Sequence, residues 1–463
     1  MLFSSLEFIF RFLPIFLIIY YISPGKIKNV VILLGSLVFY ACGEPLFVAL
    51  MLALIIVNFL CSKGVFASVK SGGKGGFFVF LALLIDLGSL FLFKYYNFFA
   101  ENINYFRGEE VLKDLNLTLP LGISFYTFQM ISYVIDVRRG EVEKVGLIKF
   151  GTYVSMFPQL VAGPILRYKD VEKDLVSRKV TLRNLENGLV LFSCGLGFKV
   201  LLANKMSILW NDVQNIGFNS MGPYMAWLGA LAFTFEILFD FWGYSVMAMG
   251  LGEMLGFKIP RNFDAPYMAK TMGEFWRRWH MTLGRFFKDY VYIPMGGSRK
   301  SALCTVRNLF IVWALTGIWH GAGWNFVIWG VGLFVIILLE KLIFEDFFNK
   351  VSVIGHMYMW VLIPISWMVF EISDINSLWI YLQQMFFSFD GEVLVQTEQL
   401  IGYLKDYGPL FIICIILMTK LPIKLYELLN NTYIFTAIGF ASFWYSVYEL
   451  ARGLNNPFLY FRF

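Results

Sequence analysis

Long apolar runs separated by short polar stretches recur along the whole chain. They are at or near the roughly 20 residues that a helix needs to cross a bilayer. The runs are Phe8–Ile22, Phe77–Phe93, Leu189–Ala203, Met225–Phe241, Leu309–Leu339, Met357–Phe370 and Leu410–Met418. Because these runs are continuous rather than alternating, they indicate helices and not the strands of a membrane barrel. The pattern predicts an all-α polytopic membrane protein with roughly 10–12 spanning or half-spanning helices.

Composition agrees with this pattern. The chain is 58% hydrophobic and only 15% charged, whereas soluble domains are about 25% charged. Neither an internal repeat nor a linker is present in the sequence, so residues 1–463 are expected to form a single integral-membrane domain. The first apolar run follows Glu7 rather than a basic leader, so we expect it to be a retained helix. The five cysteines are scattered and show no metal-binding spacing.

The basic residues that give the chain its net charge of +6 are concentrated in particular loops. Lys26 and Lys28 lie in one loop, and three further lysines lie at residues 63–74. Between these basic stretches, two apolar segments flank a turn at Gly43-Glu44, so a helical hairpin would place both stretches on one side of the membrane. The positive-inside rule makes that side cytoplasmic, which predicts an N-terminus outside.

Residues Lys258–Arg307 form the least hydrophobic long region, with ten basic and three acidic residues. Within it, Thr271–Tyr290 has apolar residues at the spacing of one helical face, which predicts an amphipathic helix. Thr271 and Glu274 suit a capping-box start, and Pro294 with the glycines after it marks the stop. Because basic residues cover the other face, we expect this helix to lie at the cytoplasmic interface.

His320 is one of three histidines and lies in the run Leu309–Leu339, which holds no Asp, Glu, Lys or Arg. A straight helix of that length would measure about 46 Å, more than the roughly 30 Å hydrocarbon core. Gly317, Gly321 and Gly323 lie near its middle, so we expect a break there, with His320 at membrane depth. Irregular backbone at that depth must be surrounded by protein or line a cavity. The histidine could serve as a general base in such a cavity, or it could only pack between helices.

His280, in the stretch FWRRWHMTL, borders the apolar face of the predicted amphipathic helix. It could be an ordinary anchor at the membrane interface. The functional alternative is a residue that contacts an anionic donor, with Arg277 or Arg278 bound to the donor's phosphates.

Carboxylates inside apolar segments are costly unless they are paired or hydrated. Glu236 and Asp240 are four residues apart and share one helical face. They could orient a histidine or bind a hydroxyl, or they could bond to an arginine of the amphipathic helix. Asp136 lies just before Arg138 and Arg139, which favours a local ion pair.

Five stretches resemble the membrane-bound O-acyltransferase family, in particular its bacterial branch of alginate and peptidoglycan O-acetyltransferase membrane subunits. They occur in the family's order and are LPLGISFYTFQMISYVIDVRRGE (Leu119–Glu141), MFPQLVAGPILRY (Met156–Tyr168), FDFWGYSVMAMGLGEMLGFKIPRNFDAPY (Phe239–Tyr267), FWRRWHMTLGRFFKDYVYIPMGGS (Phe275–Ser298) and RNLFIVWALTGIWHGAGWNFVIWG (Arg307–Gly330). The chain departs from the family pattern at Trp242 and Val246, where a small residue and an acid are usual, and at Gly332 and Leu333, where a Tyr-His pair is common.

The resemblance implies a ring of helices around a central tunnel that joins a cytoplasmic donor site to an extracytoplasmic acceptor site. It implies two catalytic histidines, His320 in the WHG motif and His280 in the RWH motif. The other candidate tunnel, donor-binding or acceptor-binding residues are Trp319, Trp324, Asn308, Asn325, Asp240, Glu236, Trp276, Arg277, Arg278 and Asp289. No metal and no bound cofactor is expected.

The predicted function is transfer of an acetyl group across a bacterial cytoplasmic membrane. The donor is a cytoplasmic thioester, acetyl-CoA or an acyl carrier, and the acceptor is a hydroxyl of an extracytoplasmic polysaccharide or cell-wall glycan. The resemblance also implies a secreted or membrane-tethered partner protein, besides membrane lipid; nucleic acid is not an expected partner. The alternatives are D-alanyl transfer to teichoic acid, a transporter that supplies acyl groups to a separate enzyme, and a structural scaffold for the partner.

Overall fold

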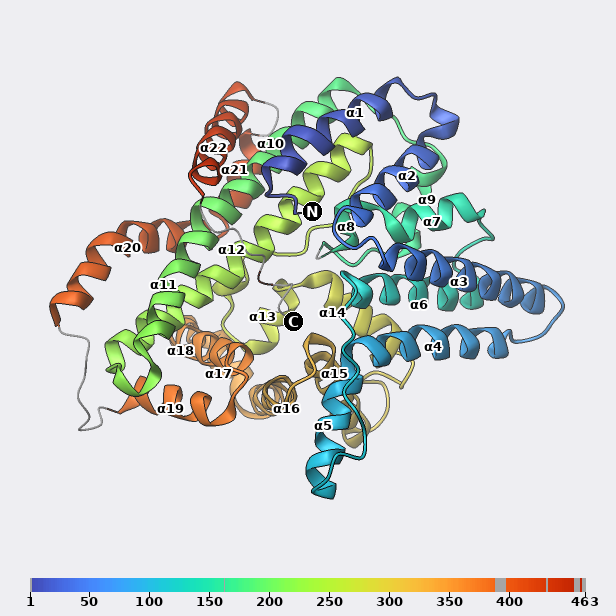
Figure 1. Cartoon of the computed structure of the whole chain (residues 1–463). Coiled ribbons are helices and arrows are strands. Elements are labelled where there is room, and N and C mark those ends of the chain that lie inside the picture. The colour runs from blue at the N-terminus through green and yellow to red at the C-terminus, as the bar shows by residue number, and fades with distance from the viewer. Residues whose placement is uncertain (1, 162, 388–396, 430–431, 454–458, 460–463) are drawn as a thin grey trace. The chain divides into compact units, whose positions relative to one another are not determined.

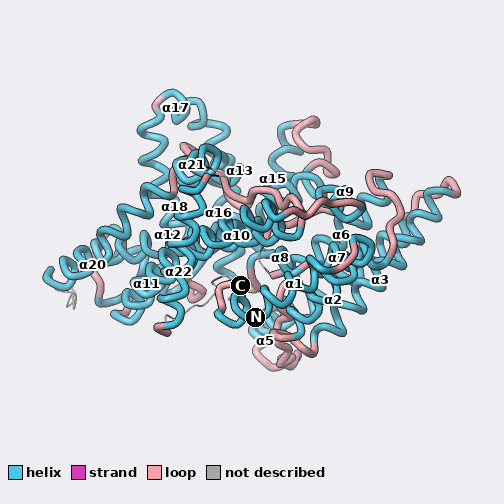
Figure 2. The backbone as a smooth tube through the Cα atoms, turned by 90° about the horizontal axis from the view of Figure 1, so that it is seen from above, coloured by secondary structure: helices cyan, strands magenta, loops and turns pink. Residues whose placement is uncertain are grey.

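The computed structural model describes residues 2–161, 163–387, 397–429, 432–453 and 459. These residues form helices and loops, and none of them lies in a strand, as Figures 1 and 2 show. The predicted all-α class is confirmed.

By its internal contacts the chain divides into two compact units. The first contains Met1–Phe192 and Tyr244–Pro260, and the second contains Ser193–Gly243 and Arg261–Phe463. The division falls inside two long helices, α10 (Leu182–Gly197) and α12 (Pro223–Leu255). Each unit is described by itself below.

The first unit is built from short and long helices joined by tight turns. They are η1 (Phe8–Phe12), α1 (Leu13–Ile22), η2 (Gly25–Ile27), α2 (Lys28–Ala41), α3 (Phe47–Lys70), α4 (Gly76–Leu90), η3 (Phe91–Tyr95), α5 (Tyr96–Arg107), α6 (Ile123–Arg139), α7 (Leu147–Ser155), α8 (Phe157–Leu160) and α9 (Tyr168–Val176). Helices α3, α4 and α6 pack on one another, and α2 packs on α7 (Figure 1). The turn predicted at Gly43-Glu44 joins α2 to α3.

One buried hydrogen bond joins α3 to α4 inside this unit. The Asn58 side-chain amide donates to the Asp86 carboxylate at 2.7 Å, and both side chains are fully buried. A carboxylate within an apolar helix is therefore stabilised by a hydrogen-bond donor from its neighbour.

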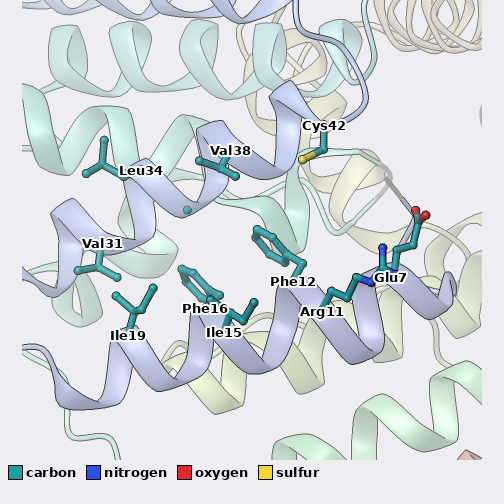
Figure 3. Close-up of a pocket in the computed structure, with 11 residues that line it drawn as sticks. Glu7, Arg11, Phe12, Ile15, Phe16, Ile19, Val31, Leu34, Val38 and Cys42 are labelled. Carbon is teal, nitrogen blue, oxygen red and sulfur yellow. The ribbon is translucent and has the colours of Figure 1, made fainter.

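An apolar groove of about 710 Å³ separates η1 and α1 from α2 (Figure 3). The ring of Phe16 lies against Gly35, so any side chain at Gly35 would collide with it. The groove is lined by aliphatic side chains such as Ile15 and Leu34, which are well exposed. Exposed aliphatic side chains along helices are the expected surface of a protein whose solvent is lipid.

The second unit carries the predicted site. Its elements are η4 (Phe198–Ala203), α11 (Asn204–Ile216), η5 (Phe218–Ser220), η6 (Pro266–Met268), α13 (Met272–Arg278), α14 (Met281–Phe287), η7 (Lys288–Tyr292), α15 (Ala302–His320), α16 (Trp324–Leu339), η8 (Glu340–Phe344), α17 (Glu345–Lys350), α18 (Ser352–Glu371), α19 (Ile375–Phe386), α20 (Thr397–Leu417), α21 (Leu421–Leu429) and α22 (Tyr433–Ala451). Helices α15 and α16 pack closely on one another, and α16 also packs on α18.

Eight helical segments among the described residues are long and apolar enough to cross a membrane. They are Phe47–Lys70, Gly76–Arg107, Leu182–Ile216, Pro223–Leu255, Ala302–His320, Trp324–Phe348, Ser352–Glu371 and Glu398–Leu417. The segment Phe8–Ile22 is apolar but shorter. The protein is therefore a multi-pass membrane protein. The larger number expected from the sequence included half-spanning helices, for which the shorter segment is a candidate.

Candidate active site

The long apolar run around His320 is broken where the sequence predicted. Helix α15 ends at His320, an extended loop follows over residues 321–323, and α16 begins at Trp324. The two helices return along one another, with Gly317 and Gly330 at their closest approach: a side chain on Gly330 would lie 2.6 Å from the Trp313 carbonyl oxygen. His320 is thus held at the tip of a tight helical hairpin. Its depth in the membrane stays a prediction.

Aromatic rings surround the His320 imidazole. The ring centroids of Trp319, Trp329 and Phe370 lie 4.9, 5.2 and 5.2 Å from its own, each close to perpendicular. His320 is only 4% exposed. These contacts come from α15, α16 and the end of α18, so three helices fix the position of this one side chain.

The second histidine breaks the helix that the sequence predicted over Thr271–Tyr290. In the structure α13 ends at Arg278 and α14 begins at Met281, so the prediction of one continuous helix is wrong. His280 lies at the break with φ 43° and ψ 51°, a left-handed conformation that costs energy for any residue except glycine. Such strain persists only where the surrounding structure enforces it.

The loop before α13 enforces the break. The Met281 N–H donates to the Asn262 carbonyl oxygen at 3.0 Å, and the Asp264 N–H donates to the Arg278 carbonyl oxygen at 3.0 Å. The Asn262 side-chain oxygen accepts from the Thr282 N–H at 3.2 Å and from the Thr282 hydroxyl at 2.9 Å. Backbone groups that a continuous helix would have paired internally are therefore paired with this loop, which hydropathy patterns cannot reveal.

His280 is buried, with an exposure of 1%. Its Nδ1 lies 3.2 Å from the Asn262 side-chain oxygen, and its ring meets Phe241 edge-on at 4.6 Å. Burial lowers the pKa of His280 to about 3, so the imidazole is neutral at physiological pH. The Trp319 ring lies 6.1 Å from His280 and 4.9 Å from His320. Both predicted catalytic histidines therefore border one indole.

The aromatic face of α13 packs against protein and not against lipid. Phe275 and Trp279 are both 2% exposed, and Trp279 lies 4.9 Å from the Trp367 ring. Trp276 lies 5.2 Å from Trp313 and 5.4 Å from Trp329. The rings therefore contact α15, α16 and α18, which are far away in sequence, and not lipid; the placement of the segment at the cytoplasmic interface stays a prediction.

A carboxylate anchors the start of α13. Glu340 accepts from the Met272 N–H at 2.6 Å and the Gly273 N–H at 3.0 Å, and the Tyr358 hydroxyl donates to it at 3.0 Å. An acidic group at a helix N-terminus is favourable for its orphan N–H groups and for the helix dipole. The Thr271 half of the predicted capping box is confirmed, since its hydroxyl oxygen accepts from the Glu274 N–H at 3.0 Å, whereas the Glu274 carboxylate accepts from the Lys270 N–H at 2.9 Å in place of the Thr271 N–H.

The two predicted asparagines hold backbone elements in place. The Asn325 amide donates to the Phe370 carbonyl oxygen at 2.7 Å, which fixes the residue whose ring covers His320. The Asn308 amide donates to the Gly297 carbonyl oxygen at 2.9 Å, which ties α15 to the loop after η7. Trp324, expected to line the tunnel, is 50% exposed at the start of α16.

The predicted basic and acidic residues of the platform differ in exposure. Arg277 is exposed, whereas Arg278 is partly buried and pairs with Glu274 at 2.5 Å. Asp289 is partly buried on η7. Trp276 on α13 has a buried indole N–H that hydrogen-bonds no residue within the described part of the chain. Arg277 is therefore open to a ligand, and the buried Trp276 N–H is a donor that a ligand entering the site could use.

Glu236 and Asp240 lie on one face of α12, as predicted; Asp240 pairs with a lysine and not with the histidine or arginine that the sequence suggested, and a role in binding a substrate hydroxyl stays a prediction. Asp240 forms an ion pair with the buried Lys199 of η4 and accepts from the Leu459 N–H at 3.1 Å. The Glu236 carboxyl hydrogen-bonds the Ser207 side chain. The pair therefore belongs to a buried polar cluster, with Lys199 where an arginine or a histidine was expected.

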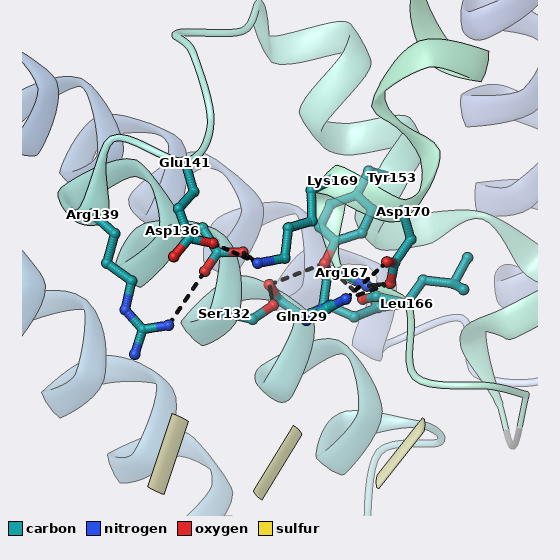
Figure 4. Close-up of polar contacts among 10 residues, drawn as sticks. All are labelled: Gln129, Ser132, Asp136, Arg139, Glu141, Tyr153, Leu166, Arg167, Lys169 and Asp170. Carbon is teal, nitrogen blue, oxygen red and sulfur yellow. Dashed lines mark hydrogen bonds and ion pairs between the residues drawn. The ribbon is translucent and has the colours of Figure 1, made fainter. Parts of the chain in front are cut away.

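Asp136 forms the local ion pair that the sequence predicted, within a larger cluster of the first unit (Figure 4). It lies 3.9 Å from Arg139 and 4.0 Å from Lys169, and Lys169 also bonds Glu141 at 2.5 Å. The Lys169 ammonium lowers the pKa of the Glu141 carboxyl. This network ties the end of α6 to the start of α9.

The residues that sequence reasoning missed contact the site from segments distant in sequence. Asn262, Glu340, Trp329 and Phe370 contact the histidines or the segment that carries His280. Asn262 and Trp329 each lie inside one of the family-like stretches, which was the available sign for these two. The described residues contain no group of three or more His, Cys, Asp or Glu side chains placed to hold a metal ion.

Comparison with known proteins gives consistent results. The model of the membrane-bound O-acyltransferase family matches residues 78–352. The chain is 36% identical over 391 residues to a protein of Azotobacter vinelandii named "probable alginate O-acetylase", covering 83% of this chain and 78% of that protein. It is 32% identical over 417 residues to the peptidoglycan O-acetyltransferase of Helicobacter pylori, covering 81% and 78%. A teichoic acid D-alanyltransferase of Streptococcus thermophilus is 29% identical over 46% of this chain and 54% of that protein.

Proposed function

The chain belongs to the membrane-bound O-acyltransferase family, and we propose that it passes an acetyl group from a cytoplasmic thioester to hydroxyls of an extracytoplasmic polysaccharide or cell-wall glycan. The O-acyltransferase activity follows from the family and from the acetyltransferase relatives. The acetyl group is favoured over D-alanine because the O-acetylating relatives match over about four-fifths of the chain, and the D-alanyl relative over less than half.

The observation that carries the proposed site is the pairing of two buried histidines on one indole. His280 and His320 lie on segments 40 positions apart in the sequence, yet both border Trp319. Polar contacts are strengthened in surroundings that exclude water, and the neighbours of both imidazoles are mostly aromatic. A charge that develops on a substrate oxygen there is stabilised strongly by any donor within reach.

In the proposed reaction His320 is the general base. It takes the proton of the acceptor hydroxyl while the hydroxyl oxygen attacks the thioester carbonyl carbon. The carbon–sulfur bond breaks, the proton passes to the leaving thiolate, and an ester and a free thiol are the products. Brief attachment of the acetyl group to His320 is the variant of this scheme. The Trp276 indole N–H and the Asn325 side-chain oxygen, both buried and unsatisfied among the described residues, are candidate partners for substrate polar atoms.

The donor is proposed to dock at the basic segment that precedes α15. Arg277, Lys288, Arg299 and Lys300 are exposed there, and arginine and lysine suit the phosphates of coenzyme A or the acidic surface of a carrier protein. The positive charge also supports a cytoplasmic position of this segment. On this proposal the protein lies in the bacterial cytoplasmic membrane, and a secreted or membrane-tethered partner protein completes delivery to the glycan.

The test uses the purified full-length protein in lipid nanodiscs with acetyl-CoA and, separately, an acetylated acyl carrier. We expect slow release of free thiol in the absence of acceptor and faster release with a soluble glycan. His320→Ala should abolish both. His356→Ala is the matched control, since His356 lies at the start of α18 outside this cluster and its replacement should leave the rate unchanged.

Three outcomes would overturn the proposal. Equal thiol release by wild type and His320→Ala would remove His320 from the chemistry. In proteoliposomes, movement of the intact acetyl thioester across the bilayer without its cleavage would identify a transporter. If glycan acetylation in cells survives His320→Ala while the partner still co-purifies, the protein is a scaffold.

A further inference from the structure

The contact between His280 and Asn262 determines which nitrogen of the histidine carries the proton. The Asn262 side-chain atom that faces Nδ1 at 3.2 Å also faces the Thr282 backbone N–H at 3.2 Å. A backbone N–H can only donate, so that atom must be the amide oxygen and not the amide nitrogen. An amide oxygen can only accept, so Nδ1 of His280 must carry a hydrogen.

Because a neutral imidazole carries a single N–H, this contact leaves the lone pair on Nε2. We infer that Asn262 is a positioning residue, which holds His280 as the Nδ1–H tautomer and so makes Nε2 a hydrogen-bond acceptor towards the substrate. The Thr282 hydroxyl donates to the Asn262 oxygen at 2.9 Å and so fixes it, and Asn262 as a whole is 1% exposed. The left-handed backbone conformation of His280 contributes to this contact, because it directs the ring towards the loop that carries Asn262.

The tautomer restricts the chemistry open to His280. An Nε2 lone pair can accept a hydrogen bond from a hydroxyl, a thiol or an amide N–H of a substrate. It cannot donate to the oxyanion of a tetrahedral intermediate, so that stabilisation must come from another group. This inference rests on the proposed function for its substrate classes, but the tautomer itself is a property of the resting protein.

The chain suits a direct measurement because it has only three histidines. Protein labelled with ¹⁵N at histidine and reconstituted in lipid gives three imidazole spectra, and His320→Gln and His356→Gln identify that of His280. Protonated and lone-pair ring nitrogens differ widely in ¹⁵N shift. We expect His280 to show Nδ1 protonated and Nε2 bare at neutral pH.

Three variants separate positioning from simple packing. Asn262→Leu removes the acceptor, so we expect the His280 tautomer to become mixed or to switch and the turnover number to fall about 10–100-fold, as when the partner behind a metal-bound histidine is removed. Asn262→Asp keeps an oxygen at that place and should keep the Nδ1–H tautomer. Thr282→Val removes the hydroxyl that helps to fix the Asn262 oxygen but leaves the contact from that oxygen to His280, so it should keep the Nδ1–H tautomer and lower the turnover number less than Asn262→Leu does.

The outcomes distinguish this inference from the proposed function. An Nε2–H tautomer in the wild type, or an unchanged tautomer in Asn262→Leu, would overturn the inference even if the protein is an active acetyltransferase. If Asn262→Leu does not fold, Asn262→Asp and the wild-type spectrum still decide. An Nδ1–H tautomer in a protein that shows no acyl transfer would support the inference about the tautomer and contradict the proposed function.

Discussion

At the scale of single residues, His280 shows how burial can keep a side chain neutral even below about pH 6.5, where water would favour its protonated form. Its ring is enclosed by Phe241, Trp319 and Asn262, and its pKa is lowered to about 3 by burial. A free histidine has a pKa of about 6.5. The difference means that the folded protein keeps this group neutral at pH values where the unfolded chain would protonate it.

This difference predicts a pH dependence of stability. Below about pH 6.5 the His280 side chain binds a proton in the unfolded chain but not in the folded protein. The free energy of unfolding therefore falls as the pH drops from about 6.5 towards 3, and this group does not affect it above that range. At pH 5 the contribution is about 2 kcal/mol. The measurement is the thermal unfolding midpoint in detergent at pH 7.5 and at pH 5.

The control for this prediction is His280→Asn. Asparagine tolerates the left-handed backbone better than other residues with a side chain, and it does not titrate. The variant should lose less stability than the wild type between the two pH values. Equal losses would show that His280 is not held neutral by its surroundings.

The charged residues of α12 show where residue types alone stop being informative. The sequence identified Glu236 and Asp240 as carboxylates that need partners, but not which partners. The ion pair from Asp240 to Lys199 joins elements about forty residues apart, across the turn between α11 and α12. Removing one member of a buried pair leaves an uncompensated charge, which lowers stability. A buried charged residue can therefore be needed for stability alone, and its presence is a weak guide to catalysis.

At the scale of elements, length arithmetic predicted the break at His320 correctly, because a run too long for the bilayer must bend and glycines marked the place. The same reasoning failed for residues 271–290. There the helical spacing is present, but Asn262 and Asp264 pair with the backbone on either side of His280 and interrupt the helix. A loop outside the segment competes for the backbone hydrogen bonds of the helix, and the spacing of apolar residues within the segment does not reveal this competition.

The hairpin of α15 and α16 gives a prediction at this scale. A methyl group on Gly317 would collide with the Phe326 carbonyl oxygen, which belongs to the facing helix. We expect Gly317→Ala to force the helices apart, to lower stability by about 1–3 kcal/mol and to reduce acyl transfer, since His320 lies one turn away. The measurements are the unfolding midpoint and the rate of thiol release.

Gly332 provides the matched control on α16. A methyl group there would meet nothing within 4 Å, so Gly332→Ala should leave stability and activity unchanged or slightly improved by its better helix propensity. If the two substitutions behaved alike, the close approach of α15 and α16 would not be what holds His320 in place.

At the scale of the whole molecule, the sequence was sufficient for the fold class and for the family, because both depend on features spread over hundreds of residues. Continuous apolar runs predicted the helical membrane protein, and ordered motifs carried the resemblance that the comparisons then confirmed. The surroundings of the histidines depend instead on which rings from α16 and α18 meet them, such as Trp329 and Phe370. Those contacts are tertiary and leave no local pattern.

Membrane orientation is the property of the whole molecule that charge alone predicts. Helix α3 has 24 residues, a length of about 36 Å, which is enough for its two ends to lie on opposite faces of a bilayer. Cys42 is exposed just before α3 and Ser71 is exposed just after it, in the basic stretch that the positive-inside rule places in the cytoplasm.

The orientation can therefore be tested with a membrane-impermeant maleimide on intact cells. In a variant whose only thiol is Cys42, we expect labelling from outside. In a variant without native cysteines that carries Ser71→Cys, labelling should require permeabilised cells. The reverse pattern would place the N-terminus and the turn before α3 in the cytoplasm. It would also turn the basic segment around His280 towards the outside if the same charge rule governs both, and the thioester donor would then have no access to it from the cytoplasm.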